Sequence, residues 1–259
     1  MLKLGWFSTG RGEGSRNLLT TIHDAIHRGE IDAEIQFVFT NREPGEAEGS
    51  DRFQRLVGEL SLELVCYSSR RFKKEWRGEA GQWRLAYDRE VMRRLEGFSP
   101  DLGVLAGYML IVGEEMCHQY TMINLHPAAL GGPAGTWQEV IWKLIRDRAT
   151  YSGVKIHLVT EELDRGPALT FCTYAITGGG FDPHWDAVRN RSVEELIAEE
   201  GEELPLFKLV REQGVRRELP LIVETLKALA EEGVGIDRTG PIEARDLTDK
   251  IEEVIAPSS

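Results

Sequence analysis

The sequence predicts an α/β protein with a mostly parallel, twisted sheet, helices on both faces of that sheet, and a helical, acidic C-terminal extension. Strand-like and helix-like segments alternate along the first half of the chain, which is typical of parallel α/β architecture. After three glycines at residues 178–180, the chain continues with acidic helices and no evident strand. The length of 259 residues fits one large domain with an appendage. We therefore expect a core at residues 1–180, and C-terminal helices at residues 181–259 that pack on it or extend from it.

The expected strands are short, mostly apolar segments bounded by glycine, proline or polar turns. The longest apolar run, residues 102–112, is about half of the roughly 20 residues that a membrane span needs, so it indicates a buried strand. In chain order, strands are expected at residues 2–8, 33–41, 62–67, 102–106, 121–125, 151–160 and 168–177.

The expected helices lie between these strands and after them. In residues 136–147 apolar side chains recur at helical spacing, so one face of that helix packs against the sheet. Residues 68–81 carry arginine and lysine and are expected to form a polar loop, and the glutamates at 194–203 form a solvated helix face. Helices are expected at residues 17–28, 51–60, a segment ending at 97, 136–147 and 219–229.

Charge and cysteine content exclude several classes of function. Asp and Glu number 43 against 31 Lys and Arg, a net charge of −12, which disfavours nucleic acid as a partner but leaves room for a pocket that binds one anionic small molecule. The cysteines Cys66, Cys117 and Cys172 lack C-x-x-C spacing, which indicates free thiols in a reducing compartment. The N-terminal apolar segment is too short for a signal peptide. We expect a cytoplasmic monomer or homodimer with no membrane partner.

A glycine-rich segment, Gly-Arg-Gly-Glu-Gly-Ser-Arg-Asn at residues 10–17, separates the first expected strand from the first expected helix. Glycines allow backbone N–H groups to approach an anion, and the start of a helix adds free donors and a favourable dipole. Ser15 or Asn17 can cap the helix. Neither a Walker motif nor G-x-G-x-x-G is present, so ATP and NAD are disfavoured. A flexible turn with no ligand remains the alternative.

Polar side chains lie at the end of the strand expected at residues 121–125. Asn124 and His126 share one strand face, since side chains alternate with a period of two. An amide donor and a protonated imidazole suit a carbonyl oxygen that becomes negative during attack. Asp164 follows His126 by 38 residues, and its carboxylate would favour the protonated form of the His126 ring if the two side chains lay within reach of each other. A structural histidine and ordinary turn chemistry at Asp164 remain open as alternatives.

Two long motifs resemble those of the folate-dependent formyltransferases. Residues 121–130, TMINLHPAAL, are similar to the N-I-H-P-S-L-L stretch of that family, and residues 153–167, GVKIHLVTEELDRGP, to its G-x-x-V-H-x-V-T-x-x-L-D-x-G-P. The resemblance runs over most of residues 1–230. Shorter matches are residues 12–18 to the phosphate loop G-x-G-S-N-L, 40–42 to S-N-R, 105–109 to L-A-G-F/Y-M, and 218–221 to a late helix.

The resemblance implies a formyltransferase, Rossmann-like fold and a reaction. The reaction is transfer of formyl from the cosubstrate 10-formyltetrahydrofolate to a phosphorylated amine, with glycinamide ribonucleotide, an intermediate of purine biosynthesis, as the first expectation. The amine attacks the formyl carbon, His126 and Asn124 hold the oxyanion, and Asp164 supports the imidazolium and moves protons through water. The alternatives are formyl transfer to an amino sugar, hydrolysis of formyltetrahydrofolate, and a folate- or nucleotide-binding protein without turnover.

The resemblance also assigns residues, and it implies no metal. The catalytic residues are Asn124, His126 and Asp164, and His157 and Thr160 are their neighbours. The remaining assignments are Met109, Leu110, Ile111 and Val112 to the folate cleft, and Gly12, Gly14, Ser15 and Asn17 to the ribonucleotide phosphate.

This sequence departs from the family pattern mainly around the acceptor. Leu110 stands where the family has arginine, and residues 131–137, GGPAGTW, lack the second histidine of the family. Residues 178–182, GGGFD, replace an acidic segment that binds the substrate amine. Arg16 is an extra residue in the phosphate loop, while residues 68–81 and the acidic tail look like insertions. The formyl-transfer residues are all present, so the departures bear on the acceptor more than on the chemistry.

Overall fold

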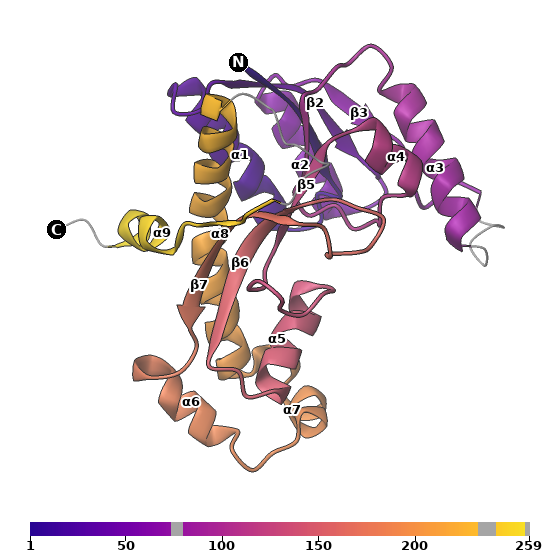
Figure 1. The fold of residues 1–259 in the computed structure, drawn as a ribbon. Helices are drawn as coiled ribbons and strands as arrows, with labels where there is room; N and C mark the ends of the chain where they lie inside the picture. The colour runs from indigo at the N-terminus through magenta and orange to yellow at the C-terminus, as the bar shows by residue number, and fades with distance from the viewer. Residues whose placement is uncertain (74–79, 233–241, 257–259) are drawn as a thin grey trace. The chain divides into compact units, whose positions relative to one another are not determined.

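The structure is a computed structural model that describes residues 1–73, 80–232 and 242–256. The chain forms two compact units, and each unit is built from three separate stretches of the sequence (Figure 1). The predicted boundary at residue 180 stays a prediction. The first unit contains Met1–Leu125, Leu158–Gly166 and the described part of Val223–Gly240, and the second contains His126–His157, Pro167–Ile222 and the described part of Pro241–Ser259.

The first unit contains a run of parallel strands in the hydrogen-bonded order β3-β2-β1-β4-β5. All described pairs among them are parallel, so the side chains that follow their C-terminal ends gather at one edge, as in other α/β proteins. In the register of the last pair, Leu105 lies opposite Asn124. The strands are β1 (Leu2–Ser8), β2 (Ala33–Thr40), β3 (Leu64–Cys66), β4 (Leu102–Leu105) and β5 (Met122–His126).

Helices alternate with these strands and bury apolar side chains against them. The core of the first unit is rich in aromatic rings, among them Phe7, Phe37 and Phe39, which are fully buried. Figure 1 shows α3 and α4 side by side, and contacts between them agree. The helices are α1 (Glu13–His27), α2 (Glu48–Glu59), α3 (Ala80–Arg94) and α4 (Glu114–Gln119).

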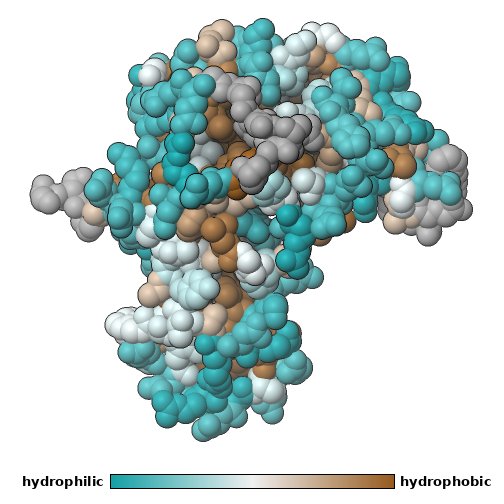
Figure 2. Space-filling view, viewed as in Figure 1, coloured by the Kyte–Doolittle hydropathy of each residue, from teal (hydrophilic) through white to brown (hydrophobic). Residues whose placement is uncertain are grey.

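The second unit is built on an antiparallel pair, β6 (Tyr151–Leu158) and β7 (Ala168–Ala175), to which β8 (Arg245–Asp246) adds a short parallel strand. Its core lies between α5 and the helices after residue 178. Figure 2 shows mainly hydrophilic side chains where Figure 1 places α6 and α7, as predicted for the glutamates at 194–203. The helices are α5 (Trp137–Arg146), α6 (Asp182–Ala187), α7 (Val193–Glu199) and α9 (Thr248–Ile255).

The predicted fold class is confirmed: parallel strands dominate, helices alternate with them, and the part of the chain after residue 180 is helical and acidic. The long helix α8 (Pro205–Glu232) begins in the second unit and ends in the first. Cys66, Cys117 and Cys172 are free thiols, as predicted. Among the described helices, none combines the length and apolar character that crossing a bilayer requires.

Several predicted boundaries differ from the structure. The helix predicted at residues 219–229 is the end of α8, which continues through Pro220, although proline usually terminates a helix. The prediction missed α4 because its six residues directly follow a buried apolar run, and it missed β8, which has only two residues. The predicted loop at 68–81 forms turns up to residue 73 and ends where α3 begins, and its residues 74–79 lie outside the described residues.

Candidate active site

The glycine-rich segment forms a tight connection between β1 and α1. Gly10 has φ +66°, and a Cβ there would lie 2.7 Å from Phe53, so only glycine fits. The helix begins at Glu13 with Gly12 as its N-cap, and no side chain caps it. The prediction that Ser15 or Asn17 caps the helix is therefore wrong, because both residues lie inside it. Because the first N–H groups of a helix have no intrahelical acceptor, this end offers an anion backbone donors.

The segments that follow β1 and β4 are joined by hydrogen bonds. The Thr9 N–H donates to the Gly107 carbonyl at 3.1 Å, and the Met109 N–H donates to the Thr9 hydroxyl at 2.8 Å. Gly107 has φ +70°, and a Cβ there would lie 2.7 Å from Ser15 Oγ. Ser15, one of the residues predicted to hold phosphate, therefore lies against Gly107, two residues before the segment predicted to contact folate.

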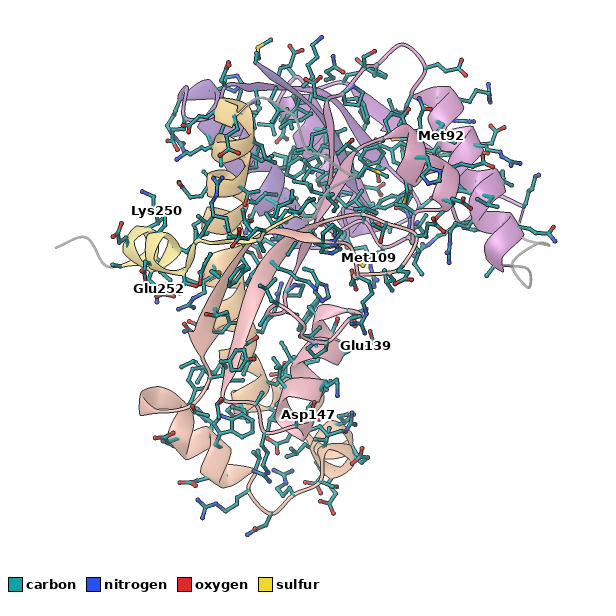
Figure 3. The ribbon with its side chains drawn as sticks, in the orientation of Figure 1. Met92, Met109, Glu139, Asp147, Lys250 and Glu252 are labelled. Atoms are coloured by element: carbon teal, nitrogen blue, oxygen red, sulfur yellow. The ribbon has the colours of Figure 1, made fainter. Side chains whose placement is uncertain are left out.

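The predicted folate residues differ in their exposure. Met109 is half exposed, Leu110 and Ile111 are partly buried, and Val112 is buried in the aromatic core of the first unit. Figure 3 labels Met109 on this segment after β4. Three of the four side chains thus have accessible apolar surface, whereas Val112 can only support the segment from below.

The end of this segment is anchored by Asp88, a residue that sequence reasoning missed. Asp88 is buried on α3, and its Oδ2 accepts a hydrogen bond from the Gly113 N–H at 2.6 Å. Burial is the largest influence on this carboxyl and raises its pKa to about 7, although the Gly113 hydrogen bond and Arg84 act in the opposite direction. An aspartate within the charged stretch of α3 gave no sequence signal, because burial is a property of the fold.

The structure brings Asn124 and Asp164 together, although they are 40 residues apart. The Asn124 amide Nδ2 donates to Asp164 Oδ1 at 3.4 Å. Asp164 is 8% exposed and has φ +56°, a left-handed conformation that aspartate tolerates better than most residues. Nearby, a Cβ on Gly166 would lie 1.8 Å from the Leu158 carbonyl, so the turn packs tightly on the strand end. This turn presents the carboxylate to the amide.

His126 is the last residue of β5, two residues after Asn124 and on the same face of the strand. It is 2% exposed, and its Nε2 lies 2.8 Å from the Pro133 carbonyl oxygen. A carbonyl oxygen can only accept, so Nε2 carries a hydrogen in this arrangement. The buried His157 ring lies edge-on to the His126 ring at 6.1 Å between centroids.

Two further polar residues lie on β6 and in the turn that follows it. Thr160, a predicted neighbour, donates from its hydroxyl to the Glu162 carbonyl at 3.2 Å and so shapes the turn before Asp164. Lys155, which sequence reasoning missed, is 7% exposed on β6, two residues before His157 and on the same strand face. A lysine within an otherwise apolar strand was the signal that could have identified it.

Among the described residues, one group of side chains has the donor types and spacing for a metal ion. Glu114, His118 and Glu161 bring ligand atoms within 4.8 Å of one another. All three are exposed, and none is a predicted site residue. No predicted catalytic residue belongs to this group.

The sequence model of the family described as "Formyl transferase" matches residues 11–178, which is 168 of the 259 residues. The chain belongs to the formyl transferase family. The match includes every predicted site residue and ends before α6, so α6, α7, α8 and α9 lie beyond the part that defines this family.

Named relatives of this formyl transferase include phosphoribosylglycinamide formyltransferases. The protein from Escherichia coli (strain K12) is 29% identical over 160 residues, which cover 61% of this chain and 66% of that protein. The protein from Dictyostelium discoideum is 29% identical over 168 residues, or 60% of this chain and 77% of that protein. The chain thus spans just under two thirds of the Escherichia coli relative.

Solved structures share the fold over a larger part of the chain. Glycinamide ribonucleotide transformylase 1 from Symbiobacterium toebii has a TM-score of 0.63 at 21% identity and covers 90% of this chain and 89% of that one. A formyltetrahydrofolate deformylase from Pseudomonas syringae pv. tomato has a TM-score of 0.59 at 20% identity, with 89% and 62% covered. At these identities the likeness concerns the fold.

Proposed function

We propose that this formyl transferase moves the formyl group of 10-formyltetrahydrofolate to the amino group of glycinamide ribonucleotide, a step of purine biosynthesis. The observation that carries the proposal is the convergence of Asn124 and Asp164 at 3.4 Å, with His126 two residues further along the same strand. The names of the relatives from Escherichia coli and Dictyostelium discoideum support the same acceptor. The substrates are small molecules, and we place the reaction in the cytoplasm.

The proposed chemistry follows from the donors at the strand end. The amine lone pair attacks the formyl carbon, and the carbonyl oxygen becomes an oxyanion. Asn124 donates an amide N–H to that oxygen, and the second donor is the Nε2–H of His126, which leaves the Pro133 carbonyl that accepts it in the structure. The new C–N bond forms, the bond from the formyl carbon to the folate nitrogen breaks, and the proton lost by the amine reaches that nitrogen.

In this proposal Asp164 orients the Asn124 amide and takes part in proton transfer. Its Oδ1 already accepts from the Asn124 amide, which fixes the direction of the amide group. A water bound to the carboxylate carries the proton between the amine and folate. His157 packs edge-on against the His126 ring and limits its rotation, and Thr160 supports the turn.

The proposed ligand positions follow from the two hydrogen-bonded segments after β1 and β4. Met109, Leu110 and Ile111 offer apolar surface to the ring system of folate, and the buried Val112 supports them. The residues proposed for the ribonucleotide phosphate are those at the start of α1, where backbone N–H groups are the donors: Gly12, Gly14, Ser15 and Asn17.

Hydrolysis of formyltetrahydrofolate is the second candidate function. The observation that favours it is the shared fold with the deformylase from Pseudomonas syringae, together with the departures from the family pattern around the acceptor, such as GGGFD at residues 178–182. In that case water takes the place of the amine, and Asn124, His126 and Asp164 keep the same roles.

One assay separates these functions. Purified protein is mixed with 10-formyltetrahydrofolate, and release of tetrahydrofolate is followed with and without glycinamide ribonucleotide. Release only when the ribonucleotide is present supports the proposal. Release without any amine favours the hydrolase, release only with an amino sugar favours a different acceptor, and tight folate binding without release indicates a binding protein.

A further inference from the structure

The second unit contains a cavity of about 300 Å³ that none of the proposed site residues lines. It lies between the end of α5 and the segment that leads into α7. Arg146, Arg148 and Arg191 bring three guanidinium groups to its wall, against one carboxylate from Glu194. Three positive groups around one small cavity are notable in a chain with a net charge of −12, because acidic side chains are available to replace or neutralise them.

The wall of this cavity combines charge with apolar surface. Ile145, Val188 and Leu196 are buried, and each contributes to the lining. Guanidinium groups bind phosphate through pairs of parallel hydrogen bonds, and an apolar wall accommodates the organic part of a phosphate ester. The lining therefore fits an organic phosphate better than a bare ion.

Arg148 occupies a backbone position that normally belongs to glycine. It follows Asp147, the C-cap of α5, which Figure 3 labels at the end of this helix. Its N–H donates to Ile145, and the Ala149 N–H donates to Leu144, which is the hydrogen-bond pattern of a Schellman motif. Arg148 has φ +47° at the position of this motif where glycine is favoured, because a Cβ is strained there. Neither helix termination nor the helix dipole requires an arginine at this position.

The side chain of Arg148 is held, and its charge is not neutralised within the described chain. One guanidinium nitrogen donates to the Arg189 carbonyl in the turn that carries the other wall of the cavity. Among the described residues, no carboxylate forms an ion pair with Arg148. A guanidinium has five N–H donors, so this one hydrogen bond leaves others for a ligand.

The two other arginines are paired with carboxylates. Arg146 lies 3.0 Å from Glu194, and Arg191 lies 2.6 Å from each of Glu199 and Glu200. Glu194 and Glu199 are largely exposed, so their two pairs contribute little and can be exchanged for a bound anion at small cost, whereas Glu200 is partly buried. The turn that forms this wall lies beyond residue 178, where the family match ends, whereas Ile145, Arg146 and Arg148 lie within the match.

We propose that this arginine-lined cavity binds a phosphate-bearing small molecule, with Arg148 as its anchor. The site uses other residues than those proposed for the ribonucleotide phosphate at the start of α1. The proposal is independent of the formyl-transfer activity.

Titration calorimetry with phenyl phosphate tests the site, with benzoate and phenol as probes that lack the phosphate. The measurements are made in a Ser15→Asp background, so that a phosphate bound at the start of α1 does not contribute. We expect phenyl phosphate to bind at one site in this background and the other two probes to bind at least tenfold more weakly. Absence of phenyl phosphate binding in the Ser15→Asp protein overturns the proposal.

Arg148→Gly is the decisive variant, because glycine fits the left-handed backbone. We expect it to weaken phenyl phosphate binding at least tenfold while the thermal midpoint stays equal or rises. Arg146→Gln, which removes only an exposed ion pair, should also weaken binding, and Arg189→Gln, in the same turn but outside the lining, should leave it unchanged. Unchanged binding in Arg148→Gly, or equal loss in Arg189→Gln, overturns the assignment.

Discussion

A turn of the first unit and a turn of the second both hold a charged residue in the left-handed backbone conformation. Asp164 in the first unit has φ +56°, and Arg148 in the second has φ +47°. Aspartate tolerates this conformation because its short side chain bonds locally, and Asp164 lies in the long motif shared with the family. Arginine has no such advantage. The first turn thus belongs to the matched family segment, whereas the left-handed arginine needs another reason, and the proposed binding of phosphate in the arginine-lined cavity would supply one.

The largest effects are expected at the turn of the first unit and its partners. Asn124→Ala, His126→Ala and Asp164→Asn should each lower kcat by about 10²- to 10⁴-fold, because they remove an oxyanion donor or the carboxylate that supports it. Asparagine also tolerates φ +56°, so Asp164→Asn separates the charge from the backbone. Steady-state kinetics and circular dichroism measure the loss and the fold. A folded His126→Ala protein with full activity would contradict the proposed mechanism.

The two units should also differ in how pH affects them. Burial raises the pKa of Asp88 in the first unit to about 7, while Cys172 and Tyr174 in the second unit have pKa values raised to about 11 and about 12, far above the acidic range. Between about pH 4 and pH 7, folded Asp88 binds a proton that the unfolded chain releases. The free energy of unfolding should therefore fall as pH rises through this window, by up to about 1.4 kcal/mol per pH unit.

Urea denaturation at several pH values measures this slope. Asp88→Asn should flatten the slope between pH 4 and pH 7, because the amide does not titrate, whereas Asp249→Asn, a change at an exposed aspartate, should leave it as it is. An equally steep slope in the Asp88→Asn protein would show that another group is responsible.

A smaller effect is expected at the start of α1 and sharpens the distinction between the two anion sites. Ser15→Asp should weaken binding of glycinamide ribonucleotide about tenfold or more by charge repulsion and leave folate affinity nearly unchanged. Ser15→Asn has nearly the same size without the charge, and it controls for the close packing of Ser15 against Gly107. Titration calorimetry with each ligand measures both affinities. Equal loss of folate and ribonucleotide binding would contradict the role given to this segment.

The smallest effects are expected on the stability of the protein, at the two residues with left-handed backbone, Asp164 and Arg148. Asp164→Gly and Arg148→Gly each relieve backbone strain, so each should raise the free energy of unfolding by up to about 1 kcal/mol unless lost side-chain bonds offset the gain. Only Asp164→Gly should also abolish formyl transfer. Chemical denaturation and the activity assay are compared for the pair. Loss of activity in Arg148→Gly would show that the turn of the second unit also contributes to the reaction, which contradicts the difference proposed between the two turns.

Local patterns predicted much of this molecule because they depend on neighbours in the chain. Leu2–Ser8 begins and ends where the mostly apolar segment before the glycine-rich turn predicts, and the helix at Trp137–Arg146 follows from its apolar spacing. The long motif around Asp164 predicted a residue close to Asn124, and the structure places them in contact.

The features that the sequence did not predict depend on tertiary packing. The burial of Asp88, the contact of Ser15 with Gly107, and the continuation of α8 through Pro220 all require knowledge of what lies opposite these residues. The left-handed backbone of Arg148 gave no signal either, because arginine is not a residue that marks such a position.

The interleaving of the two units has a consequence for synthesis on the ribosome. The end of α8 belongs to the first unit, where Leu226 is fully buried and Lys227 lies 3.4 Å from Glu30. This part of the helix is made almost 100 residues after β5, a delay of roughly 5 to 20 s at ordinary elongation rates. During that interval the nascent N-terminal segment lacks a buried part of its own core. Chaperones that shield apolar surface should therefore associate with this chain until residue 232 has left the exit tunnel.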